Sequence, residues 1–187
     1  SPTGLDNNPG TQEAPWKTLT RAAATVQAGD TAIFADGTYD ETTVASFAFD
    51  GTPTAPITVK AQNKHKAIIY FHGLTTIKIS LVDRKYITIQ DFEITQDNVG
   101  TTWSDVFIRH YNGEGITIRG NKIHHAKVNT KSSYGKDILI EGNIFYDGLG
   151  YDAFGASNVI VRNNEVYQFD SSSQGLLLKG GTRNAQV

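Results

Sequence analysis

The stretch GITIRGNKI (Gly115–Ile123) decides the fold, because three other stretches of the chain repeat its pattern. Each places a short apolar strand before a turn of Asn, Gly or Asp, and a second short strand after that turn. The other three are YITIQDFEI (Tyr86–Ile94), DILIEGNIF (Asp137–Phe145) and NVIVRNNEV (Asn158–Val166). Their central apolar residues, from Ile89 to Val161, recur at intervals of 29, 22 and 21 residues. A repeat at such a period predicts stacked structural units.

The fold class that this period predicts is all-β, a parallel β-solenoid. One coil is too thin to bury its own apolar face, so stacking at roughly 4.8 Å would place Ile over Ile in a continuous column. Asn tolerates the left-handed backbone of a sharp corner, and its amide can bond to the Asn of the next coil. We therefore expect a ladder of Asn121, Asn143 and Asn164, or its neighbour Asn163. The alternative is a β-sandwich, but hairpin turns would make adjacent strands antiparallel and need no common period.

Composition excludes several classes of protein. The chain has 187 residues, a formal net charge of -2, 18 Gly and no Cys. Without cysteine it has no disulfide framework, no thiolate zinc site and no cysteine nucleophile. The near-neutral charge argues against a nucleic-acid partner. The chain has no run of about 18 apolar residues, so no membrane insertion is predicted. We find neither a phosphate-binding loop nor a dinucleotide fingerprint, so no organic cofactor is predicted.

The chain is expected to form one domain over residues 1–187. Residues 1–14 are turn formers and predict an irregular lead-in. Residues 15–28 predict a helix, with Pro15 at its first position, Gly29 just past its end, and an apolar stripe at helical spacing. Coils should occupy residues 30–187. A new repeat begins at Asn184 and stops at Val187, which predicts a fragment of a longer protein with further C-terminal coils. The start at Ser1 indicates a removed leader or tag, although an internal fragment would look the same.

The opening block GTQEAPWKTLTRAAATVQAGDTAIFADGTYDE (Gly10–Glu41), followed by GTPTAPITVKAQ (Gly51–Gln62) and the Asn-turn repeats, resembles secreted right-handed parallel β-helix proteins of the pectate lyase superfamily. The resemblance covers nearly the whole chain. It implies a right-handed, single-stranded β-helix, an N-terminal helix that caps the first coil, and a bacterial protein at an extracellular or cell-surface location. Lyases, epimerases, hydrolases and non-catalytic proteins share this scaffold, so fold alone does not set the activity.

Aligning the coils by their Asn turns brings several chemically useful side chains toward one side. A groove lined by cations and aromatic rings suits an acidic polysaccharide. We take Lys179 as the candidate base, Arg109 as the group that holds a uronate carboxylate, and His110 as the candidate histidine. Alternatively, Lys179 is an ordinary surface lysine. The candidate sugar platforms are Tyr134, Tyr151, Trp103 and Phe154.

Asp147 and Asp152 lie five residues apart in a glycine-rich segment, where two carboxylates and loop carbonyls can bind calcium. The alternative is that both cap turns. The leading functional hypothesis is a polysaccharide lyase that cleaves a uronic-acid-containing polymer by β-elimination. A non-catalytic β-helix for glycan binding, adhesion or spacing is the second hypothesis, and a trimeric phage or cell-surface spike is the third. The sequence leaves open whether the protein is an enzyme.

Overall fold

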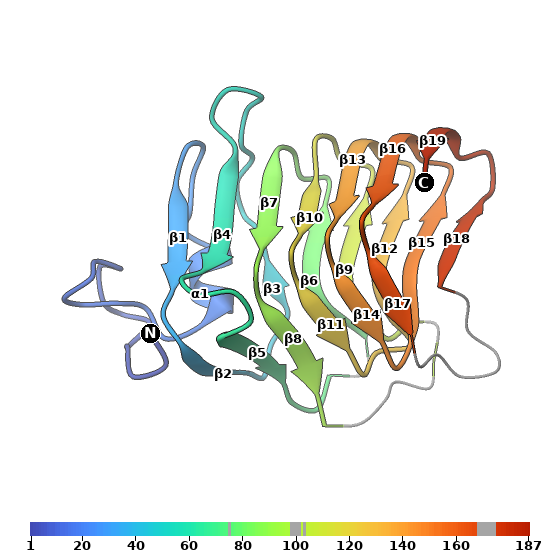
Figure 1. The fold of residues 1–187 in the computed structure, drawn as a ribbon. Helices are drawn as coiled ribbons and strands as arrows, with labels where there is room; N and C mark the ends of the chain where they lie inside the picture. The colour runs from blue at the N-terminus through green and yellow to red at the C-terminus, as the bar shows by residue number, and fades with distance from the viewer. Residues whose placement is uncertain (75, 98–101, 103, 168–174) are drawn as a thin grey trace.

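The computed structural model describes residues 1–74, 76–97, 102, 104–167 and 175–187, and these residues form a β-solenoid. The coils follow one another from the blue N-terminal end to the red C-terminal end (Figure 1). Successive coils contribute strands to three sheets, here called A, B and C, and strands pair in parallel throughout the described residues. The predicted solenoid is therefore confirmed.

Sheet A contains the column of apolar residues on which the prediction rested. Its strands are β1 (Thr31–Phe34), β4 (Ile57–Ala61), β7 (Ile87–Gln90), β10 (Thr117–Arg119), β13 (Lys136–Glu141), β16 (Ser157–Arg162) and β19 (Arg183–Gln186). Ile118 pairs with Ile89 on one side and Ile140 on the other, and Ile140 pairs with Val161. All four side chains are buried. Parallel, in-register pairing thus places the equivalent apolar residues of successive coils directly over one another, as the sequence period predicts.

Sheet B follows sheet A across the short turn of each coil. Its strands are β2 (Gly37–Glu41), β5 (Ala67–Phe71), β8 (Glu93–Gln96), β11 (Lys122–His124), β14 (Ile144–Tyr146) and β17 (Glu165–Tyr167). At the turn, the amide nitrogen of Asn121 donates to the side-chain oxygen of Asn143 at 3.1 Å, and Asn143 donates to Asn164 at 3.0 Å. The same amide nitrogens also donate to backbone carbonyls of the preceding coil, at Ile89, Ile118 and Ile140, so each corner is tied to the coils on both sides.

Sheet C completes each coil. Its strands are β3 (Ala45–Ser46), β6 (Ile77–Val82), β9 (Val106–Tyr111), β12 (Val128–Ser133), β15 (Leu149–Phe154) and β18 (Leu176–Lys179). Ile79 and Leu81 of β6 point into the coil and are fully buried, while Ser80 between them faces outward. This alternation decides which residues of the later strands can meet a ligand.

The N-terminal helix is much shorter than predicted. Helix α1 covers Leu19–Ala23 rather than residues 15–28. Thr18 caps its N-terminus by accepting the Arg21 N–H, and Asp6 of the lead-in accepts the backbone N–H of Lys17 and of Thr18 at 2.9 Å each. These contacts hold residues 17–18 outside the helix. No helix of the described residues is long and apolar enough to cross a membrane.

Helix α1 nevertheless covers the first coil. It packs against β2 and β3, and Leu19, Ala22 and Ala23 join the buried core. Glu41 at the end of β2 is itself buried, and its carboxylate accepts the N–H groups of Leu19 and Thr20 and the hydroxyl of Thr20. Burial raises the pKa of Glu41, against the lowering effect of these hydrogen bonds. A strand thus supplies the cap that ties the helix to the end of the solenoid.

Candidate functional site

The outward surface of sheet C carries a column of charged side chains. Lys131 of β12 pairs with Arg109 of β9 on one side and with Asp152 of β15 on the other. Parallel strands place residues of equal register directly above one another, so these three side chains lie on one face, one coil apart. The neighbouring β18 contributes Leu177 at the same register. The outward surface of β9, β12, β15 and β18 is here called the sheet C face.

Two lysines converge on Asp152 within this face. The ammonium nitrogen of Lys131 lies 3.2 Å from one carboxylate oxygen of Asp152, and that of Lys179 lies 3.2 Å from the other. Both contacts are ion pairs without aligned hydrogen-bond geometry. The carboxylate is fully buried, whereas the side chains of Lys131 and Lys179 are 19% and 41% exposed. One negative charge is therefore shared by two lysines that reach solvent.

An aromatic row runs beside the charged column. The ring centroid of Tyr134 lies 5.7 Å from that of Tyr111 and 5.4 Å from that of Phe154, with both contacts edge to face. The Arg109 guanidinium lies 5.7 Å from the Tyr111 centroid. Tyr134 and Tyr111 are exposed, so each presents an apolar ring with a polar hydroxyl to a ligand. Cations and aromatic rings thus share one surface.

The structure brings together five of the predicted site residues: Arg109, Lys179, Asp152, Tyr134 and Phe154. It also adds Lys131 and Tyr111, which sequence reasoning missed. A signal for Lys131 existed, because it follows Arg109 by 22 residues and precedes Asp152 by 21, which is the period of the coils. Trp103, a further predicted sugar platform, lies outside the described residues.

The predicted placement of His110 and Tyr151 is wrong. Both are 1% exposed, since each is adjacent in sequence to an outward residue and therefore points into the coil. The His110 ring lies 3.4 Å from the Ser132 hydroxyl, and desolvation lowers its pKa to about 4. Burial likewise raises the pKa of the Tyr151 hydroxyl. Neither side chain presents a surface to a polysaccharide.

Asp147 and Asp152 do not form the predicted calcium site. Asp147 lies at the corner after β14, where its carboxylate is 3.7 Å from the His125 ring. Both oxygens of Asp152 already face ammonium groups. Among the described residues, no three acidic or histidine side chains are grouped so that they could hold a metal ion. The groups around Asp152 are therefore cationic, and this environment does not fit a calcium ion.

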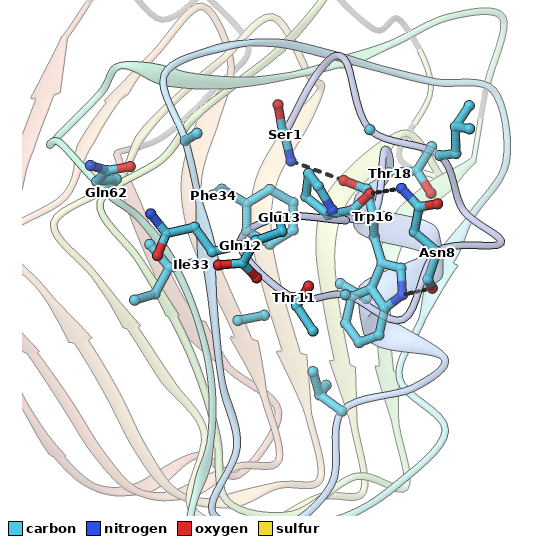
Figure 2. Close-up of a pocket in the computed structure, with 18 of the residues that line it drawn as sticks. Ser1, Asn8, Thr11, Gln12, Glu13, Trp16, Thr18, Ile33, Phe34 and Gln62 are labelled. Atoms are coloured by element: carbon cyan, nitrogen blue, oxygen red, sulfur yellow. Dashed lines mark hydrogen bonds between the residues drawn. The ribbon is translucent and has the colours of Figure 1, made fainter.

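A separate cavity of about 1080 Å³ lies at the N-terminal end, between the lead-in and β1. Figure 2 shows Trp16 and Phe34 on its walls, with the Ser1 amino group bonded to the Trp16 carbonyl and the indole N–H bonded to the Asn8 carbonyl. The residues that line it include Glu13 and Asp30 but no lysine or arginine. Two carboxylates thus line this cavity without a lysine or arginine beside them, whereas the sheet C face gathers cationic side chains.

The chain is thus a right-handed parallel β-helix with a cationic and aromatic surface on one sheet. A family model described as "Pel9A-like, right handed beta helix region" matches residues 1–182, and the chain belongs to this family. Pectate lyase PEL9 of Emericella nidulans is 24% identical over 196 residues, which cover 100% of this chain and 44% of that protein. The chain spans less than half the length of the curated relatives it matches.

Solved structures share the fold at lower identity. An alginate lyase from Paenibacillus sp. str. FPU-7 superposes with a TM-score of 0.71 at 15% identity, covering 89% of this chain and 60% of the other. Pectate lyase Pel9A superposes with a TM-score of 0.56 at 17% identity, covering 93% and 56%. At these identities the likeness concerns the backbone architecture.

Proposed function

We propose that the protein is a polysaccharide lyase that cleaves a uronic-acid-containing polymer by β-elimination. The observation that carries the proposal is the sheet C face, where Arg109, Lys131 and Lys179 stand beside an exposed aromatic row. Relatives named as lyases of acidic polysaccharides support the same class of reaction. An extracellular location belongs to the proposal, because such polymers lie outside cells.

The chemistry requires a cation and a base. A cation at the uronate carboxylate stabilises the negative charge that develops when the C5 proton leaves. The base takes that proton, the electron pair of the C5–H bond forms the C4–C5 double bond, and the C4–O bond to the next sugar breaks. The departing oxygen takes a proton from water or an acidic group. One polymer thus gives two chains, one with an unsaturated end.

The roles follow from exposure and position. Arg109 and Lys131 occupy consecutive coils and would hold the carboxylate. Lys179 is the more exposed of the two lysines on Asp152, so a bound polymer can reach it, and we assign it as the base. Tyr134 and Phe154 would position the sugar rings. Each role uses an outward side chain that takes no part in the core.

The test is the ultraviolet absorbance of the unsaturated product on polygalacturonate, alginate and glycosaminoglycans, with and without added calcium. Lys179→Ala should abolish the signal and leave the melting temperature nearly unchanged. Lys85→Ala is the matched control, because its side chain is also half-exposed and ion-paired, with Glu114 at 3.7 Å. If no polymer yields product, the lyase proposal is wrong. Binding without turnover would instead support a non-catalytic glycan-binding domain.

A further inference from the structure

The two lysines of the sheet C face share a carboxylate that no solvent reaches. We propose that Asp152 is a positioning residue, which fixes the side-chain nitrogens of Lys131 and Lys179 so that Lys131 meets the substrate carboxylate and Lys179 meets the C5 proton. The inference rests on the proposed lyase function and extends it by assigning the group that orders the cations. It also gives the site its own cationic centre at the place where calcium was predicted.

The geometry supports positioning rather than simple charge balance. Lys131 is directly in register with Asp152, whereas Lys179 is in register with Phe154 and reaches back to the carboxylate. The two contacts, both 3.2 Å, use opposite oxygens of one buried group. A lysine stem has four rotatable bonds, so an unheld ammonium group would sample many positions. Anchoring both groups before the substrate arrives lowers the entropy cost of binding it.

The sheet C face keeps a net positive charge, which favours binding of an anion. Before the substrate binds, Arg109, Lys131 and Lys179 carry three positive charges and Asp152 cancels one of them; with Lys179 neutral as the base, Arg109 and Lys131 still leave a net positive charge. Each lysine ammonium group has three N–H donors. Because neither ion pair uses an aligned N–H, these donors remain for a ligand. The exposed parts of both lysines then face the same surface as the aromatic row.

Removing the carboxylate separates the two explanations, because they predict opposite effects. Asp152→Asn keeps the size of the side chain and makes the face more positive. If Asp152 only tempers charge, KM for an acidic oligosaccharide should fall and kcat should stay the same. If it positions the lysines, kcat should fall about tenfold or more, since small misplacements of reacting groups are costly. The plateau of the pH–rate profile should fall with it.

Lysine labelling gives a readout that needs no turnover. Wild type and Asp152→Asn are treated with a trace of acetic anhydride, and acetylation of each lysine is followed by peptide mass spectrometry. Lys131 and Lys179 should react several-fold faster in the variant, because their ion pairs are lost. Lys85, which pairs with Glu114, is the internal reference. Asp147→Asn is the matched control variant, since its carboxylate faces His125 instead.

The outcomes are distinct. Unchanged labelling would show that the shared ion pair does not hold the lysines, and would overturn the inference while leaving lyase activity possible. Faster labelling with unchanged kcat would also overturn it. If wild type turns over no polymer, the proposed function fails, and the Kd for an oligogalacturonate decides whether Asp152→Asn weakens binding, as positioning requires. If Asp152→Asn does not fold, Lys131→Gln is the substitute variant. It leaves the ion pair between Lys179 and Asp152 in place, so Lys179 should still be acetylated slowly. Faster acetylation of Lys179 would overturn the inference.

Discussion

Acid should destabilise this protein through His110, and the size of the effect follows from its burial. The ring fills space under two turns: a Cβ on Gly113 would lie 2.6 Å from its Nε2, and one on Gly135 would lie 2.1 Å from its Cε1. Desolvation lowers its pKa to about 4, and the nearby Arg109 charge adds to the lowering, against a hydrogen bond with Gly113. In the unfolded chain the pKa should be about 6.5.

The sign follows from proton binding. Between pH 6.5 and 4 the unfolded chain binds a proton at His110 and the folded chain does not, so stability falls as the pH falls through this window. A pKa difference of roughly 2.5 units corresponds to about 3 kcal/mol of unfolding free energy between pH 7 and pH 4. The whole of this contribution is present above pH 6.5.

Urea unfolding at pH 7 and pH 4, followed by circular dichroism, measures this difference. Other groups titrate in the same window, so the comparison is with His110→Gln, which has no titrating ring. The variant is expected to be less stable at pH 7, but it should lose about 3 kcal/mol less than wild type on acidification. Equal losses in the two proteins would refute the argument that His110 is buried as the neutral imidazole.

Three further changes probe the fold. Glu41→Gln should cost about 1–3 kcal/mol in urea unfolding, because the amide nitrogen cannot accept the N–H groups of α1 that the carboxylate accepts. Asn143→Ala should cost about 3 kcal/mol, since it leaves partners in two coils unsatisfied, while the exposed Asn63→Ala should change stability by about 0.5 kcal/mol or less. Ile118→Asp should abolish the folded far-ultraviolet spectrum at pH 7 by burying an unpaired charge in the sheet A column; a cooperative transition near the wild-type midpoint would contradict this.

The repeat predicted the coils because it reports packing directly. Ile89, Ile118 and Ile140 must stack if each coil is to bury an apolar face, and the sequence period is the coil period. The helix was overestimated for a different reason. Its stripe, with Pro15 before it, has helical spacing, but contacts from the distant Asp6 and Glu41 set where the helix starts. Such non-local hydrogen bonds leave no periodic signal.

Lys131 was missed because its strand does not look like one. Strand β12 reads VNTKSS, and its buried residues include Asn129, Thr130 and Ser132 as well as Val128. A hydrophobic pattern therefore predicts a loop there. Parallel pairing with β9 and β15 satisfies the backbone of β12 on both sides, and the Asn129 amide nitrogen donates to the Tyr146 carbonyl. The spacing of Lys131 from Arg109 and Asp152, which equals the coil period, was the signal that predicts this strand, whereas its apolar content was not.

Alternation along sheet C explains both the successes and the errors at the site. Arg109 and His110 are neighbours in sequence, as are Asp152 and Tyr151, so only one of each pair lies on the outward side of the sheet. The outward member adds little to the core, whereas the inward member fixes the shape of the coil. Substitutions at Arg109, Lys131 or Lys179 should therefore change activity with small effects on folding, and substitutions at His110 or Tyr151 should act through stability. A residue of the sheet C face can thus be recognised experimentally by the separation of these two effects.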